Sequence, residues 1–414
     1  MGSVRNYLIV TLSYWGFTLT DGALRMLVLL HFYTLGYTPF MLASLFLLYE
    51  AAGIFANLGG GWLAARFGIP RMLATGLALQ IGGLLMLSAL NPAWGAAMSV
   101  AWVVAAQGVS GVAKDLTKTA SKTAIKATSE GGSGQLFKWV AWFTGSKNAM
   151  KGLGFFLGGL LLQTAGFRGA LWLMAGMLGI VLLAGLASLP HRLGKAKASK
   201  SFGELFAKTR AINLMAGARI FLFGSRDIWF VVGLPVFLYA NGWQFIHVAG
   251  FLAAWTIGYG VVQGLAPSVI RRSADGLSRE VAEARIWGLA LTAIPAVLAL
   301  GLAATPIRPD MIVVAGLCAF GFVFAVISSL HSYLILAYAG SKKAAEDVGF
   351  YYAANAGGRL LGILLSGVLA QWGGLAACLW GSAAMLALCQ GLVMLLPSGS
   401  ERRDTAPVAA ALER

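Results

Sequence analysis

Long apolar stretches follow one another along the chain, separated by short polar segments. Twelve of them are long enough to cross a hydrocarbon layer about 30 Å thick. They cover approximately 7–33, 40–64, 71–90, 94–116, 137–163, 169–189, 212–239, 247–269, 285–304, 311–336, 347–371 and 375–396. Backbone exposed to lipid must satisfy its hydrogen bonds internally, so runs this long and continuous predict helices and not strands. We therefore expect an all-α membrane protein with twelve transmembrane helices.

The composition supports this interpretation. Of the 414 residues, 58% are hydrophobic and only 11% are charged, which is too few charges to coat a water-soluble surface. The first apolar run is too long for the core of a signal peptide, and no small-residue cleavage pattern follows it, so we expect it to be retained as a helix.

The net charge of +16 is distributed unevenly between the connections. Alternate connections hold most of the basic residues: Arg66, Arg71, Lys118, Lys122, Lys126, Lys138, Arg192, Lys195, Lys197, Lys200, Lys208, Arg210, Arg271, Arg272, Arg279, Arg285, Lys342 and Lys343. The opposite connections hold Arg168 and Arg308. Basic loops face the cytoplasm, which predicts a multi-pass protein of the bacterial inner membrane with both termini cytoplasmic. No basic domain with interleaved aromatic residues lies outside the membrane, so we expect no nucleic-acid partner.

The two halves of the chain repeat one another. An offset of 206 residues aligns Phe17 with Phe223, Asp21 with Asp227, Tyr33 with Tyr239, Gly36 with Gly242, and Arg66 with Arg272. An offset of 208 aligns Lys151 with Arg359, Gly154 with Gly362, Gly159 with Gly367, Gln163 with Gln371, and Gly166 with Gly374. We expect an N-terminal six-helix bundle over 1–189, a basic linker over 190–211, a C-terminal six-helix bundle over 212–397, and a disordered tail over 398–414.

This arrangement resembles the major facilitator transporters, which bind substrate between two parallel repeats near the membrane midplane. Members of that superfamily usually carry an Asp-Arg pair between the second and third spans. Here Gly61, Arg66 and Gly68 keep their positions, but Ala65 replaces the expected Asp. We therefore assign Arg66 no partner.

Charged residues at mid-depth in the spans are candidates for function because each costs roughly 2.5–3.5 kcal/mol to insert. Six are basic, namely Arg25, Lys147, Lys151, Arg219, Arg226 and Arg359, and three are acidic, namely Asp21, Glu50 and Asp227. Asp21 and Arg25 are four residues apart and are placed to neutralise each other. Lys147 and Lys151 share that spacing and repel unless an anion or a carboxylate lies between them. The alternative is that all of these residues form ion pairs that only fix packing.

The surplus of three positive charges predicts an anionic substrate, because Arg suits bidentate phosphate-like groups and Lys acts as a point charge. Our candidate substrate-binding residues are Arg25, Lys147, Asn148, Lys151, Arg226, Asn355 and Arg359, with Asp21, Glu50 and Asp227 as proton carriers or ion-pair partners. Lys114, Lys118, Lys122 and Lys126 recur every four residues. They form either a funnel at the cytoplasmic mouth of the cavity, with the first three as its main residues, or a basic stripe at the membrane surface.

Other chemistry is absent from the sequence. No Walker loop, nucleophile elbow or metal-ligand spacing occurs, and the three cysteines form no CxxC pair. The Gly152-Leu-Gly154 segment, followed by Gly158, lies within an apolar span and indicates close helix packing, not a dinucleotide loop. We expect no enzyme activity, no cofactor and no metal.

Four segments carry a closer resemblance: RNYLIVTLSYWGFTLTDGALRMLVLLHF, GVAKDLTKTASKTAIK, FKWVAWFTGSKNAMKGLGFFLGG and ARIFLFGSRDIWFVVGLPVFL. They resemble the ArsJ family of organoarsenical efflux permeases within the major facilitator superfamily. That resemblance implies arsenate resistance, in which a glyceraldehyde-3-phosphate dehydrogenase makes 1-arseno-3-phosphoglycerate and the permease exports it. It implies functional pairing with that dehydrogenase, and we expect a monomer in membrane lipid.

Two other substrate classes stay open on the same fold. One is a sugar phosphate or phosphate taken through an antiporter. The other is a cationic drug exported with proton coupling, which requires unpaired acids facing the cavity and fits less well because basic residues outnumber acidic ones.

Overall fold

A computed structural model describes residues 2–55, 67–128, 133–190, 209–270, 273, 277–304, 307–338 and 344–397, with side chains described except at 2–4, 7, 122–145, 267, 336 and 344–349. This part of the chain is helical and contains no strand. The helices are α1 (Gly2–Thr34), α2 (Pro39–Ser44), α4 (Ile69–Ser88), α5 (Ala96–Thr128), α6 (Ser133–Ser188), α7 (Arg210–Ile228), α8 (Leu234–Ala240), α9 (Phe245–Val269), α10 (Ser278–Ala303), α11 (Pro309–Tyr338) and α12 (Ala344–Met394). A π-helical turn, Trp229–Gly233, joins α7 to α8. The predicted all-α architecture is confirmed.

Helices α6 and α12 are each long enough to contain two predicted spans, and each kinks at a glycine. Gly166 in α6 has φ 67°, and Gly374 in α12 has φ 61°, next to Gly373. A positive φ is accessible to glycine at no steric cost. Each kink falls in the gap between two predicted spans, so that α6 and α12 each carry two of them, as the matched glycines of the repeat indicate.

Helix ends differ from the predicted spans at several places. The span predicted over 40–64 is broken by a turn at 45–46, continues as helix over 47–55, and then leaves the described residues. Helix α5 runs on to Thr128, and α10 begins at Ser278 instead of at 285. The predicted spans ended where the apolar runs end, whereas the backbone hydrogen bonds of α5 and α10 continue through neighbouring polar residues. Residues 61–66, the linker over 191–208 and the tail over 398–414 lie outside the described residues, as do the side chains of Lys122 and Lys126.

Glycines bring two helix pairs into close contact. A Cβ built on Gly154 of α6 would collide with the Leu19 carbonyl oxygen of α1, and one built on Gly358 of α12 would collide with the Ile220 carbonyl oxygen of α7. Only glycine permits such backbone approach, which is how helices associate in lipid. The α1–α6 and α7–α12 contacts correspond to one another in the repeat.

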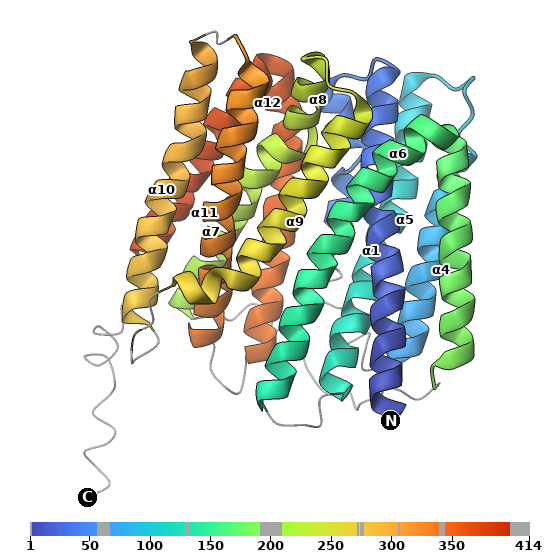
Figure 1. The fold of residues 1–414 in the computed structure, drawn as a ribbon, viewed down its shortest axis with the longest axis horizontal. Coiled ribbons are helices and arrows are strands. Elements are labelled where there is room, and N and C mark those ends of the chain that lie inside the picture. The colour runs from blue at the N-terminus through green and yellow to red at the C-terminus, as the bar shows by residue number, and fades with distance from the viewer. Residues whose placement is uncertain are drawn as a thin grey trace, which may run out of the picture.

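Helices from the two halves of the sequence also pack against each other: α6 lies against α9 (Figure 1), and α12 packs against α2. Gly159 of α6 abuts Ala249 of α9, and its repeat partner Gly367 of α12 abuts Ala43 of α2. The Tyr33 and Tyr239 rings, matched in the repeat, meet edge-on at 5.3 Å. Helix α1 starts at the lower end in Figure 1 and ends at Thr34, so the Tyr33–Tyr239 contact lies near the opposite end of α1.

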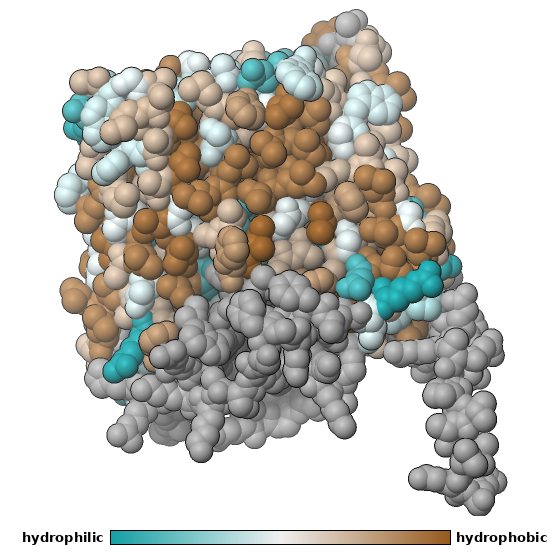
Figure 2. Space-filling model, turned by 180° about the vertical axis from the view of Figure 1, so that it is seen from behind, coloured by the Kyte–Doolittle hydropathy of each residue, from teal (hydrophilic) through white to brown (hydrophobic). Residues whose placement is uncertain are grey.

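The outer surface is apolar. In the part of the chain that the structure describes, eight helical stretches are long and apolar enough to cross a membrane, two of them double-length. Large apolar side chains such as Ile180, Leu183 and Val297 are exposed, and Figure 2 shows apolar residues spread over the middle of the face seen from behind. Such a surface fits contact with lipid and not with water.

Candidate functional site

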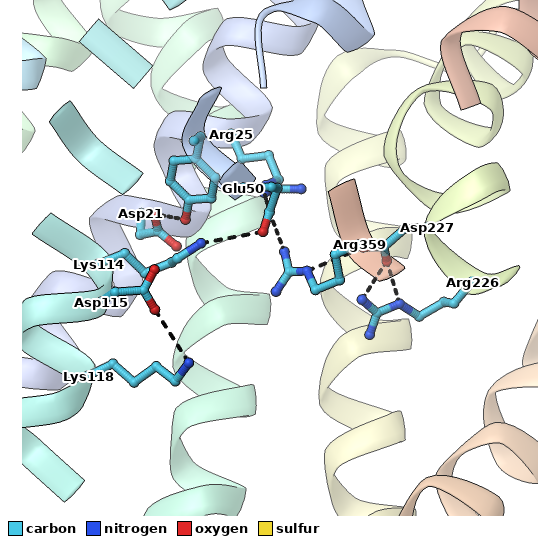
Figure 3. A network of polar contacts seen from close by, with 10 residues as sticks. Asp21, Arg25, Glu50, Lys114, Asp115, Lys118, Arg226, Asp227 and Arg359 are labelled. Atoms are coloured by element: carbon cyan, nitrogen blue, oxygen red, sulfur yellow. Dashed lines mark hydrogen bonds and ion pairs between the residues drawn. The ribbon is translucent and has the colours of Figure 1, made fainter. Parts of the chain in front are cut away.

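Charged side chains from both halves of the sequence converge in the interior (Figure 3). Arg25 lies on α1, Glu50 on the 47–55 helix, Lys114 on α5, and Lys151 on α6; Arg226 and Asp227 lie on α7, and Arg359 on α12. We call these residues, together with Asp21 and Tyr49, the central network. Arg226 and Asp227 lie in the last turn of α7, just before the π-helical turn.

Glu50 is the centre of the network. Its side chain is 1% exposed, and Oε1 accepts hydrogen bonds from Arg25 Nη2 and Arg359 Nη2, each at 2.6 Å. Lys114 Nζ lies 3.5 Å from the other carboxylate oxygen. Charge-assisted hydrogen bonds of this length are the strong class. Since Arg359 is 309 residues away in sequence, this carboxylate joins the two halves of the chain.

Arg359 extends the network to a second carboxylate. Its Nε lies 3.3 Å from Asp227 Oδ2, although the geometry is too poor for a hydrogen bond, so we regard the contact as electrostatic. Asp227 Oδ1 accepts from Arg226 Nε at 2.7 Å and from Nη2 at 2.5 Å. The π-helical turn begins two residues later, and Ser366 Oγ of α12 lies 3.3 Å from its Val232 and Gly233 backbone nitrogens. Single π turns are frequent at functional sites because they change the direction of neighbouring side chains.

The predicted neutralisation of Asp21 by Arg25 is wrong. The Asp21 carboxylate accepts a hydrogen bond from the Tyr49 hydroxyl, whereas Arg25 bonds to Glu50 and lies over the Phe46 and Tyr49 rings at 5.3 Å. A four-residue spacing puts two side chains on one stripe, but here both bond to the neighbouring helix, Asp21 to Tyr49 and Arg25 to Glu50.

Lys151 has no ion-pair partner among the described residues. It is half-buried, its Nζ lies 5.6 Å from the centre of the Phe155 ring, and it is within electrostatic range of Asp21, Glu50 and Arg359. Lys147, one turn earlier, is half-buried and interacts with neighbouring residues. Of the two lysines of the predicted stripe, Lys151 is the one that we include in the central network.

The two asparagines differ. Asn148 Nδ2 donates to Gln263 Oε1 of α9 at 3.3 Å, which joins the two halves at a second place. Asn355 is half-buried, one turn before Arg359 on α12, and its Oδ1 accepts no hydrogen bond from the described residues. Asn355 Oδ1 is therefore a buried acceptor without a donor among the described residues, whereas Asn148 is engaged.

Lys114 is placed differently from its predicted role. We expected it in a cytoplasmic funnel with Lys118 and Lys122, but its side chain is 17% exposed, contacts Glu50 and lies 3.8 Å from the centre of the Tyr49 ring. Lys118, one turn further along α5, pairs with Asp115 at 3.4 Å. A long apolar stem lets lysine place its ammonium well away from its own Cα. The position of Lys114 in the sequence therefore did not predict that its ammonium reaches Glu50.

The central network keeps a positive surplus. Five cations (Arg25, Lys114, Lys151, Arg226 and Arg359) face three carboxylates (Asp21, Glu50 and Asp227), leaving two positive charges. The predicted surplus of three counted Arg219 and Lys147, neither of which we include in the network. It missed Lys114 and Tyr49; polar residues in or beside an apolar span were the available signal for both. The predicted cations are therefore mostly paired, and the excess is smaller than expected.

Known structures resemble this fold at low sequence identity. A crystal structure of the nucleoside transporter NupG, solved as a point mutant, matches with TM-score 0.70 and 13% identity over 96% of this chain and 99% of that chain. A POT family transporter in complex with a thioalcohol-conjugated peptide matches with TM-score 0.72 and 13% identity, over 94% and 96% of the two chains. No curated protein sequence matches significantly. The sequence profile described as Major Facilitator Superfamily matches residues 7–345. Because that match covers most of the chain, the protein belongs to the Major Facilitator Superfamily, a family of membrane transporters.

Proposed function

We propose that this transporter exports an organic anion from the bacterial cytoplasm, and that the anion is a phosphate-type ester, 1-arseno-3-phosphoglycerate. The observation that carries the proposal is the positive surplus of the central network, with Lys151 in no ion pair among the described residues. Superfamily members bind substrate where the two halves meet, and this network joins the halves. The ArsJ resemblance of the sequence supplies the specific ester.

Two properties of the central network favour an anionic substrate. Two surplus positive charges among largely buried side chains attract an anion more strongly than they would in bulk solvent. An ester that carries both a phosphate and an arsenate group presents two anionic ends. One end matches the Lys151 ammonium, and the other matches the planar guanidinium of Arg359, which suits bidentate oxygen pairs.

Glu50 gives the network a means to respond to substrate. An anion arriving beside Arg25 and Arg359 competes with the Glu50 carboxylate for the same N–H donors, which lie 2.6 Å from Oε1. Releasing Arg359 from Glu50 breaks a link between the two halves. Alternating access in this superfamily is a rocking of one half against the other about the substrate, so we expect binding and rocking to be coupled at Glu50.

The direction of transport follows from the membrane potential. The basic connections predict that the lower end in Figure 1, where α1 starts, faces the cytoplasm. An inside-negative potential drives an anion outward by about 2.3 kcal/mol per charge per 100 mV. Export of a multiply charged ester therefore needs no additional coupling ion.

The direct test is uptake into everted membrane vesicles, in which the cytoplasmic face points outward. Vesicles receive labelled arsenate, with or without glyceraldehyde-3-phosphate dehydrogenase, glyceraldehyde 3-phosphate and NAD. We expect label to accumulate only when all three are present, and Lys151→Gln to abolish accumulation. Arg308→Gln is the matched control, because it removes one cation whose side chain is 65% exposed.

Two outcomes would overturn the proposal. Accumulation that ignores the dehydrogenase and its substrates would exclude the ester and favour free arsenate or phosphate as substrate. Equal uptake by the Lys151→Gln and Arg308→Gln variants would exclude the central network as the anion site. Transport of a sugar phosphate in place of the ester would keep the site and change the substrate.

A further inference from the structure

A second buried cation lies outside the central network. Arg219 on α7 is 4% exposed, and its Nη1 donates to the backbone oxygen and the hydroxyl of Ser328 on α11, both at 3.3 Å. No carboxylate lies within ion-pair distance of it among the described residues. An isolated buried charge is costly unless something neutralises it.

Aromatic rings cover Arg219 but leave part of it unsatisfied. Its Cζ lies 4.0 Å from the centre of the Phe223 ring and 4.7 Å from that of Tyr351. Cation–π contacts of this kind contribute roughly 0.5–2 kcal/mol, which is less than the cost of burying the charge. The guanidinium has five N–H donors, and its Nε has no hydrogen-bond partner in the described part of the protein.

His331 adds further donor capacity at the same place. It lies on α11, one turn after Ser328, is fully buried, and is within electrostatic range of Arg219. Neither ring nitrogen has a hydrogen-bond partner among the described residues. Imidazole carries at least one N–H in either protonation state. Two buried groups on α7 and α11 therefore bring a positive charge and N–H donors to the region of Ser328, and Arg219 Nε and the His331 ring have no acceptor among the described residues.

We propose that Arg219 and His331 form an enclosed binding site for a small monovalent anion of the halide class, such as chloride. The fixed cation selects negative charge, and the unsatisfied Arg219 Nε and His331 N–H groups supply hydrogen bonds. Near-complete burial of both side chains favours a monatomic ion over a phosphate ester. The site is distinct from the central network, since Arg219 lies seven residues before Arg226 and the Phe223 ring lies between the two, 5.0 Å from the Arg226 guanidinium carbon.

The test measures thermal unfolding of the purified full-length protein in sodium chloride and in sodium gluconate at the same ionic strength. A ligand that binds only the folded state raises the melting temperature by mass action. We expect chloride at about ten times its Kd to raise the melting temperature by roughly 2 °C. Arg219→Gln should remove that difference, whereas Lys151→Gln should keep it, which separates this site from the proposed substrate site.

A second measurement covers the case in which Arg219→Gln fails to fold. Crystals of the unmodified protein grown in sodium bromide should show an anomalous scattering peak beside Arg219 and His331. Three results would overturn the proposal: no chloride-dependent shift in the unmodified protein, an equal shift in Arg219→Gln, or a bromide peak at Lys151 with none at Arg219. Failure of the proposed ester transport would leave this site unaffected.

Discussion

Replacing Glu50 by glutamine is the substitution whose effect on stability can be worked out most fully. The change keeps the size of the side chain but removes the one carboxylate that Arg25, Arg359 and Lys114 share, at 2.6, 2.6 and 3.5 Å. Removing one partner of a buried ion pair costs about 3–5 kcal/mol, because the remaining charge is left uncompensated. We therefore expect Glu50→Gln to lower the free energy of unfolding by about that amount.

Arg359→Gln should cost less, although it breaks contacts to two carboxylates. Glu50 keeps Arg25 and Lys114, and Asp227 keeps Arg226. The loss is then close to that of charged hydrogen bonds, about 1.5–3 kcal/mol. Adding Arg359→Gln to Glu50→Gln removes one of the stranded cations, so the double variant should be more stable than Glu50→Gln alone.

A double-mutant cycle measures this coupling. The four proteins are compared by melting temperature and by denaturant unfolding in one detergent, and the interaction energy should exceed about 1 kcal/mol. Transport should stay low in the double variant, because Arg359 is also proposed to hold substrate. The reasoning is refuted when Arg359→Gln proves more destabilising than Glu50→Gln, or when the two effects add. Restored transport in the double variant would assign both residues to packing alone.

Two further substitutions test how the site is supported. Gly154→Leu forces a side chain against the Leu19 carbonyl oxygen, with which even a Cβ collides, and should prevent recovery of monodisperse protein in size-exclusion chromatography. Gly176→Leu is the control, since a Cβ there meets nothing within 4 Å. Equal losses of protein in the two variants would contradict close helix packing as the cause. Tyr49→Phe removes the hydroxyl that donates to Asp21 and should lower the free energy of unfolding by about 1–3 kcal/mol; an unchanged melting temperature would show that this hydrogen bond contributes nothing.

The fold could be predicted from the sequence because its causes are local or periodic. Apolar runs of membrane length place most of the described helices, although the run over 40–64 is broken by a turn at 45–46. The repeat identifies Gly166 and Gly374 as matched positions, where α6 and α12 kink. The same repeat pairs Gly154 with Gly362, both of which lie at close helix contacts. Helix ends were less predictable, as α10 shows, because hydrogen bonding continues beyond the apolar residues.

The pairing of charges could not be predicted, because partners are set by packing between helices distant in sequence. Asp21 and Arg25 have ideal spacing within one helix, but each bonds to the next helix instead. Nothing in the sequence places Arg359 beside Glu50, 309 residues away. Glu50, Asp227 and Arg359 could therefore be singled out from the sequence as charges within apolar spans, but their pairing and the size of the surplus could not. Their role in binding substrate stays a prediction.

The most direct test of the central claim is equilibrium binding of a stable phosphate ester to the central network. 3-Phosphoglycerate, which lacks the unstable arsenate group, would be titrated into the purified transporter and its Lys151→Gln, Lys151→Arg and Arg308→Gln variants. Loss of the Lys151 charge should raise Kd at least tenfold, which is about 1.4 kcal/mol, while Lys151→Arg and Arg308→Gln bind within about threefold of the unmodified protein. Equal Kd values for the unmodified protein and Lys151→Gln would contradict the account.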